Sequence, residues 1–145
     1  MNRITLSDKP VKMIMENDIA SDIVYADKQI KDQFDKIANK LMSVNDPRDF
    51  FFVVLDKKET VMGMITFDEI KNVLNKKQYT KKFGDLKIKP NILLYTDSIK
   101  DAMNKLRDEP YDIILIVDKN CKYFGKVKAT TIQKRLNELF DTLSS

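Results

Sequence analysis

The amino-acid sequence predicts an α+β fold in which two βαββα repeats, each a small sheet with helices, pack as a pseudo-twofold pair. Two gapless internal alignments carry this prediction. Residues 51–74 align on residues 113–136, and residues 29–37 align on residues 98–106. The apolar run in the middle of each copy lacks polar alternation, which is typical of strands covered on both faces. Neither copy would bury its sheet alone, so we expect the two copies to share a core.

The elements follow in the same order in both copies. Each copy opens with an apolar patch that predicts a short strand, at residues 23–25 and 92–95. Apolar residues then recur at helical spacing on one face: Ile30, Phe34, Ile37 and Leu41 in the first copy, and Ile99, Ala102, Met103 and Leu106 in the second. The central apolar strand, a polar turn and a second strand come next. Closing helices are predicted over residues 68–77 and 130–143.

The chain divides into three segments on this pattern. Residues 1–18 are predicted to form a lead-in linker or helix, residues 19–78 the first domain and residues 79–143 the second. About seven extra residues in the first copy fall in the turn-forming stretch Ser43–Arg48. The lysine-rich link between the copies is predicted to be helical near Lys81–Leu86.

Composition argues against several classes of protein. Hydrophobic residues make up 43% of the chain and charged residues 33%, which suits a buried core with a wet surface. The apolar runs are far shorter than the roughly 20 residues that span a bilayer, and the first residues do not resemble a signal peptide. With a single cysteine, Cys121, these features predict a cytoplasmic location.

Charge and residue types argue against nucleic-acid binding and catalysis. The net charge is +4, but the lysines are interleaved with acidic residues, as on a solvated surface. We therefore expect no nucleic-acid partner. The chain has no histidine, so the commonest general base and imidazole metal ligand are missing. No catalytic residue and no metal ligand are predicted.

The junction between the last strand and the closing helix resembles a known pattern: an apolar strand, Asp, a polar turn, Gly, two apolar residues, Ser or Thr, two free positions, and Asp or Asn. The first copy reads Val53-Val54-Leu55-Asp56, then Gly63-Met64-Ile65-Thr66-Phe67-Asp68-Glu69. The second reads Leu115-Ile116-Val117-Asp118, then Gly125-Lys126-Val127-Lys128-Ala129-Thr130-Thr131. Over residues 10–143 the chain resembles a tandem pair of cystathionine-β-synthase (CBS) domains, a Bateman module.

This resemblance implies a regulatory module that binds AMP, ADP or ATP and requires no cofactor. The implied nucleotide-binding residues lie at the first junction and on the first two strands: Gly63, Ile65, Thr66 and Glu69, with Ile23, Val24, Phe51 and Phe52 around the adenine. The family has Asp where Glu69 stands, so the grip on the ribose hydroxyls is expected to be looser or lost. An alternative for Thr66 and Glu69 is a capping box, which needs no ligand.

The second junction lacks the acidic residue, because Lys128 and Thr131 occupy the Ser/Thr and acidic positions. Lys126 and Lys128 are candidate contacts for a phosphate or another anion, or are simply solvated. We therefore expect at most one good nucleotide site, in the first repeat.

The partner proteins are also predicted. Parts of the chain are similar to the cytoplasmic tails of prokaryotic chloride channels and transporters, which implies a membrane transport domain in the same full-length protein. A homodimer through the helices of the two repeats is expected from the apolar stripe Ile132, Leu136, Leu139, Phe140 and Leu143. The alternative is a structural or dimerisation module that binds no ligand.

Overall fold

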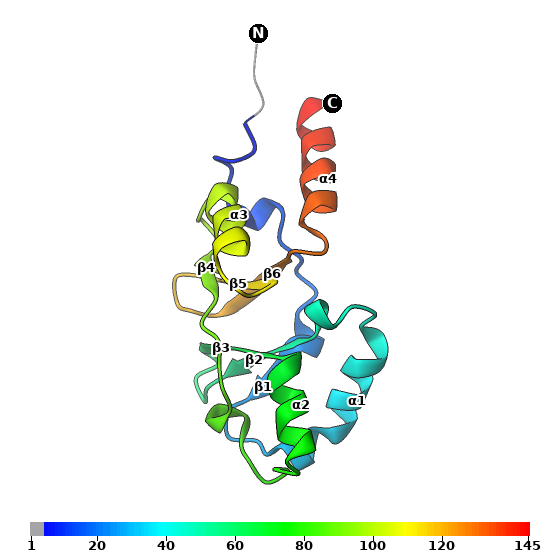
Figure 1. The fold of residues 1–145 in the computed structure, drawn as a ribbon. Coiled ribbons are helices and arrows are strands. Elements are labelled where there is room, and N and C mark those ends of the chain that lie inside the picture. The colour runs from blue at the N-terminus through cyan, green and yellow to red at the C-terminus, as the bar shows by residue number, and fades with distance from the viewer. Residues whose placement is uncertain (1–4) are drawn as a thin grey trace.

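In the computed structural model, which describes residues 5–145, two three-stranded sheets each carry helices on one face (Figure 1). The first repeat contains β1 (Ile23–Tyr25), α1 (Phe34–Ser43), β2 (Phe51–Leu55), β3 (Val61–Thr66) and α2 (Phe67–Asn75). The second contains β4 (Ile92–Leu94), α3 (Ile99–Asp108), β5 (Ile113–Val117), β6 (Tyr123–Lys128) and α4 (Ile132–Ser144). The predicted α+β fold of two βαββα repeats is confirmed.

The two sheets have the same topology and register. In each, the middle strand pairs in parallel with the first strand and antiparallel with the third. Val54 faces Gly63 in the first sheet, and Ile116 faces Gly125 in the second. Both antiparallel ladders shift register one residue later. The duplication in the sequence is therefore a duplication of the backbone.

The central strands explain why the runs are apolar on both faces. Successive side chains of a strand point to opposite sides of the sheet. In β2 and β5, one set of alternate residues fills the core between the two sheets: Phe51, Val53, Leu55, Ile113, Leu115 and Val117. The other set packs under the helices of its own repeat: Phe52, Val54, Ile114 and Ile116. The result is four layers, with the helices outside and the two sheets face to face (Figure 1).

The lead-in segment packs on the second repeat, not on the first. Val11 and Ile14 are buried in the same core as α3 and α4, and Glu16 forms an antiparallel bridge with Lys126 of β6. Of the two forms predicted for this segment, linker or helix, residues 5–18 show a linker with one 3-10 turn at Val11–Met13 and no α-helix. The backbone N–H groups of Val11 and Lys12 donate to the carbonyls of Asp97 and Tyr95, so the second repeat satisfies them.

The link between the repeats packs, in turn, on the first repeat. It contains the 3-10 turn Phe83–Asp85, within the stretch predicted to be helical. Farther along, Lys89 forms an antiparallel bridge with Met64 of β3, with N–H···O distances of 2.8 and 2.9 Å. Each segment that leads into one repeat is thus bonded to the third strand of the other repeat.

Candidate functional site

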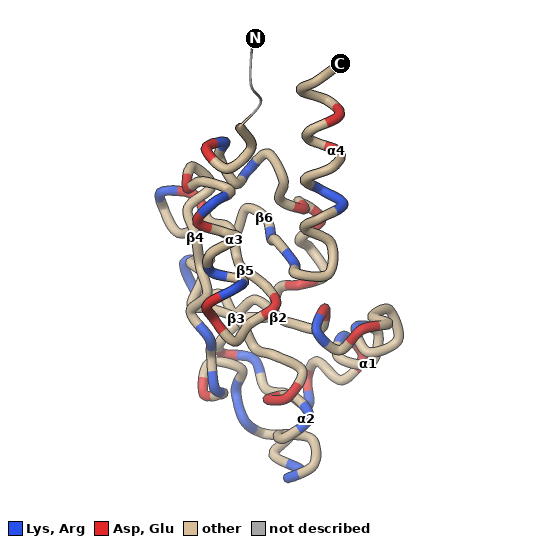
Figure 2. Tube along the Cα trace, turned by 45° about the horizontal axis from the view of Figure 1, so that its top comes forward, with Lys and Arg blue, Asp and Glu red and all other residues tan. Residues whose placement is uncertain are grey.

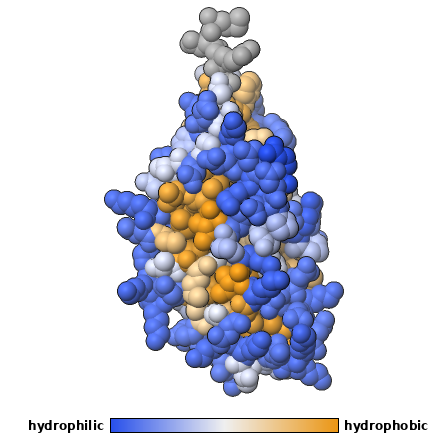
Figure 3. Space-filling model, turned by 60° about the vertical axis from the view of Figure 1, so that its left-hand side comes forward, coloured by the Kyte–Doolittle hydropathy of each residue, from blue (hydrophilic) through white to orange (hydrophobic). Residues whose placement is uncertain are grey.

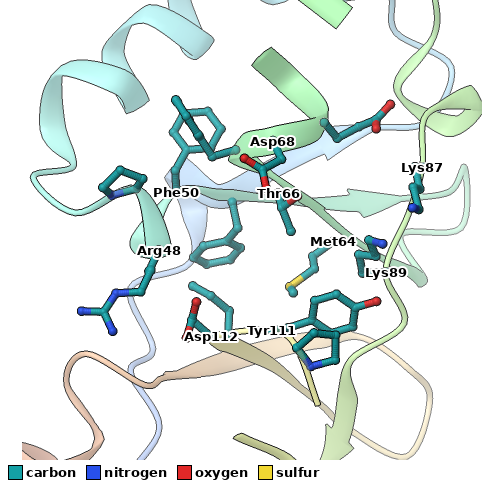
Figure 4. A pocket seen from close by; sticks show the side chains of 15 residues that line it. Arg48, Phe50, Met64, Thr66, Asp68, Lys87, Lys89, Tyr111 and Asp112 are labelled. Carbon is teal, nitrogen blue, oxygen red and sulfur yellow. The ribbon is translucent and has the colours of Figure 1, made fainter. Parts of the chain in front are cut away.

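A cavity of about 440 Å³ lies between the two repeats beside the start of α2 (Figure 4). This volume falls within the roughly 300–1,000 Å³ that is usual for small-molecule sites. Side chains reach it from the end of β3, the first turn of α2, the start of β2, the link before β4 and the turn before β5. The cavity is therefore built at the junction that the repeat pattern singled out.

The lower part of the cavity is apolar and aromatic. Met64 lies near Tyr111 in Figure 4, and Phe51 and Ile113 also line the cavity. The ammonium group of Lys89 lies 5.2 Å from the centroid of the Tyr111 ring, at cation–π distance. A flat ring would find both an aromatic and a thioether surface here.

The start of α2 offers backbone donors. Thr66 is the N-cap residue, and no side-chain hydrogen bond caps this helix, so the alternative capping box between Thr66 and Glu69 is not formed. By contrast, α3 begins with a full capping box in which the Asp101 N–H donates to Ser98 Oγ at 3.1 Å. The first N–H groups of a helix have no intrahelical partner and carry partial positive charge. At α2 they remain available to a ligand.

Charged side chains surround the cavity. Lys87 and Lys89 line it from the link, Arg48 lies on the opposite side, and Asp68 stands beside Thr66 (Figure 4). Arg48 is already paired: its Nη2 lies 2.8 Å from Oδ2 of Asp46, and this hydrogen bond raises the pKa of Arg48. The two lysines are the cations best placed to meet an anion. Elsewhere, basic and acidic residues are interleaved over both repeats (Figure 2).

Three of the eight residues predicted to contact a nucleotide line this cavity: Phe51, Thr66 and Glu69. The structure places Val24, Phe52 and Ile65 in the core under α1 and α2. Ile23 packs against the core between the sheets. The physical reason is strand alternation, because neighbours of a cavity-facing residue point the other way.

Gly63 does not line the cavity, because the link between the repeats packs against it. A Cβ atom at this position would lie 2.5 Å from Cγ2 of Ile88 and 2.7 Å from the carbonyl oxygen of Lys89, and its φ is +147°. The expected close approach at Gly63 is thus made by the link between the repeats. The cavity lies farther along β3, near Thr66.

Lys126 and Lys128, predicted as anion contacts at the second junction, have internal partners. Nζ of Lys126 lies 2.8 Å from Oδ2 of Asp22, and Nζ of Lys128 lies 3.8 Å from Oε1 of Glu16. Lys126 is buried, with 8% of its surface exposed. The structure therefore does not present this pair to solvent as a free anion site.

Sequence reasoning missed the cavity residues that come from connecting segments: Arg48, Lys87, Lys89, Tyr111 and Asp112. All lie outside the aligned strands and closing helices. The pair Lys87 and Lys89, two positions apart before Pro90, was a visible signal of a basic edge. Recognising it required knowing that the link crosses to β3.

Neither a metal-ligand cluster nor a membrane-spanning helix is found among residues 5–145. No group of three or more His, Cys, Asp or Glu side chains in this range is arranged to hold a metal ion. No helix in the same range has the length and apolarity needed to cross a bilayer.

Comparison with known proteins identifies the fold. No protein-family model and no curated protein sequence matches the chain. Solved structures match along most of its length. The CBS domains of a transcriptional regulator from Streptococcus pneumoniae match with a TM-score of 0.67 at 13% identity, over 86% of this chain and 97% of that one. CBSX2 in complex with AMP matches with a TM-score of 0.71 at 16% identity, over 91% and 98%.

A third structure is the CBS domain of a bacterial CNNM/CorC family Mg2+ transporter. It matches with a TM-score of 0.68 at 13% identity, over 90% of this chain and 76% of that one. The element order, the paired sheets and these matches agree: the chain has the fold of a tandem CBS-domain pair.

Proposed function

We propose that this chain is a regulatory CBS pair that binds one adenosine nucleotide (AMP, ADP or ATP) and controls an attached or partner protein. One observation carries the proposal: the start of α2 has no side-chain cap and borders a cavity of about 440 Å³ that Lys87 and Lys89 also line. A helix start with free N–H groups and nearby ammonium groups suits a phosphate.

The rest of the cavity suits the base and the sugar. Phe51, Met64 and Tyr111 offer the apolar and aromatic surface against which a purine ring would pack. Glu69 and Asp68 both line the cavity, so either carboxylate is a candidate to accept hydrogen bonds from ribose hydroxyls. The structure of CBSX2 with AMP supports an adenosine nucleotide as the ligand class.

The proposed partner is a membrane transport domain at the cytoplasmic face of the membrane. Structures of similar fold include the soluble part of a magnesium transporter and the CBS domain of a CNNM/CorC family Mg2+ transporter, which supports this class of partner. A chloride transporter is the specific candidate, and it rests on the sequence resemblance alone. A ligand could change such a partner only by binding one arrangement of the two repeats better than another.

We also propose a homodimer through the helices. On α1, Phe34 and Leu41 are about two-fifths exposed and Met42 is 84% exposed, and Phe140 and Leu143 are exposed on α4. Apolar side chains that remain on helix surfaces favour contact with a second copy. Apolar surface also gathers across the middle of the face shown in Figure 3, so the helices are not the only candidate. Sedimentation equilibrium at tens of micromolar would decide; a monomer alone would contradict the dimer.

The nucleotide is tested by thermal unfolding with AMP, ADP and ATP. A ligand at about 100 times its Kd stabilises the folded state by about 2.7 kcal/mol, which raises the melting temperature measurably. Either Glu69→Ala or Asp68→Ala should abolish or sharply reduce this rise, because each removes one of the two carboxylates that line the cavity. Asp101→Ala, at the capped start of α3, is the matched control and should keep the rise. No rise with any nucleotide at millimolar concentration would favour the ligand-free structural module.

A further inference from the structure

The second junction is the pseudo-twofold equivalent of the cavity, but side chains of the chain fill it. Lys126 stands 62 positions after Met64, at the same place in its sheet. Glu16 takes the place of Lys89, because each forms the antiparallel bridge to that strand position. The connecting segment therefore places a cation, Lys89, at the first junction and an anion, Glu16, at the equivalent position of the second.

Asp22 is the centre of a buried ionic cluster at this junction. Its side chain is 1% exposed. Oδ1 accepts from Nζ of Lys40 at 2.6 Å, and Oδ2 accepts from Nζ of Lys126 at 2.8 Å and from the Tyr123 hydroxyl at 2.9 Å. Both lysine side chains are only 10% exposed. One carboxylate therefore joins α1 of the first repeat to β6 of the second.

The remaining groups of the cluster are also bound. Nζ of Lys126 donates to the carbonyl of Asp18 at 2.5 Å. The ammonium groups of Lys40 and Lys126 lie 5.2 and 5.7 Å from the centroid of the Phe51 ring. Burial raises the pKa of the Tyr123 phenol, so that its hydroxyl keeps the proton it donates. Every charge in the cluster has a partner, as burial requires.

A second carboxylate, that of Glu16, lies beside the N-cap residue of α4. Oε2 of Glu16 accepts from the hydroxyl of Thr131, the N-cap residue, at 2.9 Å, and Oε1 lies 3.8 Å from Nζ of Lys128. The adjacent hydroxyl of Thr130 donates to Asp49. The N-cap hydroxyl and the lysine that would meet an anionic ligand are thus paired with Glu16, although no side-chain hydrogen bond caps the first N–H groups of α4.

We infer that Asp22 and Glu16 act as built-in anions that close the second junction and fix the two repeats to each other on this side. One consequence follows, which rests on the proposed function: the chain has one ligand site, in the cavity at the first junction.

A double-mutant cycle tests the closed junction without any ligand. Asp22→Asn should lower the melting temperature by about 10 °C or more, because it leaves two buried ammonium groups without their counter-charge. Lys126→Met installs the residue found at the equivalent position in the first repeat. The double variant should lose much less than the sum of the two single losses. Simple additivity would overturn the cluster as a unit.

The matched control is the exposed pair Arg107 and Asp108, whose Nε and Oδ1 lie 2.9 Å apart. Arg107→Met and Asp108→Asn should leave the melting temperature nearly unchanged, singly and together. A loss as large as that at Asp22 would mean that burial of the cluster is not the cause.

Formate tests whether a carboxylate is what fills the junction. In Asp22→Ala, sodium formate should raise the melting temperature more than sodium chloride of equal concentration, and the wild-type protein should show no such difference. Equal responses would contradict a built-in anion. If Asp22→Ala does not fold, the double variant of the cycle decides the point.

Ligand stoichiometry is the last measurement. Equilibrium dialysis with ATP should give one site per chain; two sites per chain would overturn the closed junction. Absence of any binding would sink the proposed function, while the double-mutant cycle would still decide whether the junction is closed.

Discussion

At the first junction Lys89 lines an open cavity beside the start of α2, whereas at the second junction Glu16 stands in the equivalent place and accepts a hydrogen bond from the Thr131 hydroxyl; neither α2 nor α4 has a side-chain cap. The backbones of the two sites share register and hydrogen bonding. What separates an open site from a filled one is therefore the sign of a few side chains on the connecting segments.

The same contrast appears at the residue before the first strand of each repeat. Asp22 accepts from two lysines and a tyrosine. Asn91, its counterpart before β4, is 2% exposed and donates to the carbonyl of Ile113 at 2.7 Å, while its Oδ1 is buried and has no partner among the described residues. A buried acceptor without a donor is costly, so the first junction is the less satisfied of the two.

The largest expected effect concerns the glycines that admit the crossing segments. Gly63→Ala should destabilise the fold by about 3 kcal/mol, because the new Cβ would meet the Lys89 carbonyl and φ is +147°. Gly125→Ala should cost less, roughly 1–2 kcal/mol, because its φ lies outside the left-handed region and its nearest neighbour, at 2.6 Å, is the flexible Met15 side chain, although the Glu16 carbonyl oxygen lies at 2.9 Å. Urea denaturation of both variants measures the difference. Equal losses would contradict the asymmetry.

An intermediate effect is expected from reversing the charge of one lysine at each junction. Lys89→Glu should weaken nucleotide binding about tenfold or more, since it places a carboxylate where a phosphate is proposed. Lys128→Glu, at the closed junction, should leave the affinity within about twofold. Titration calorimetry with ATP compares them. If Lys128→Glu weakens binding more, the ligand site has been assigned to the wrong junction.

The smallest effect separates a capped helix from an uncapped one. Ser98→Ala should cost about 1 kcal/mol of stability, because it breaks the capping box of α3. Thr66→Ala should cost only a few tenths, because its side chain makes no capping hydrogen bond, yet it should weaken nucleotide binding. Thermal unfolding with and without ATP measures both quantities. A large loss from Thr66→Ala without ligand would point to a structural role.

The elements were predictable because burial of both sheet faces leaves a strong local pattern. The prediction at residues 23–25 matches β1, and the closing helices were placed to within two residues at each end. A helix was one of the two forms predicted for the lead-in segment because its apolar residues, including Val11 and Ile14, are spaced for one. Those residues are buried by a repeat that lies about 80 residues later in the chain, and local sequence does not encode that contact.

The site was predictable only in part, for a related reason. Phe51, Thr66 and Glu69 come from strand ends and a helix start whose positions the repeat alignment defines. Lys89 and Tyr111 come from segments that reach the cavity only after the repeats have packed. The sequence favoured the first copy, because Lys128 and Thr131 replace the Ser/Thr and acidic residues in the second. It did not show that Asp22 and Glu16 occupy the second junction, because both lie outside the aligned stretches.

The packing of the lead-in segment on the second repeat limits when this segment can fold during synthesis. Val11 and Ile14 are translated before both repeats, yet their binding surface includes Ile99 and Leu139 of the second repeat. The lead-in residues must therefore wait, unpacked, until the second repeat has been translated. A fragment that begins at residue 19 would keep both sheets. It would leave a cavity in the core of the second repeat, where Val11 and Ile14 are buried.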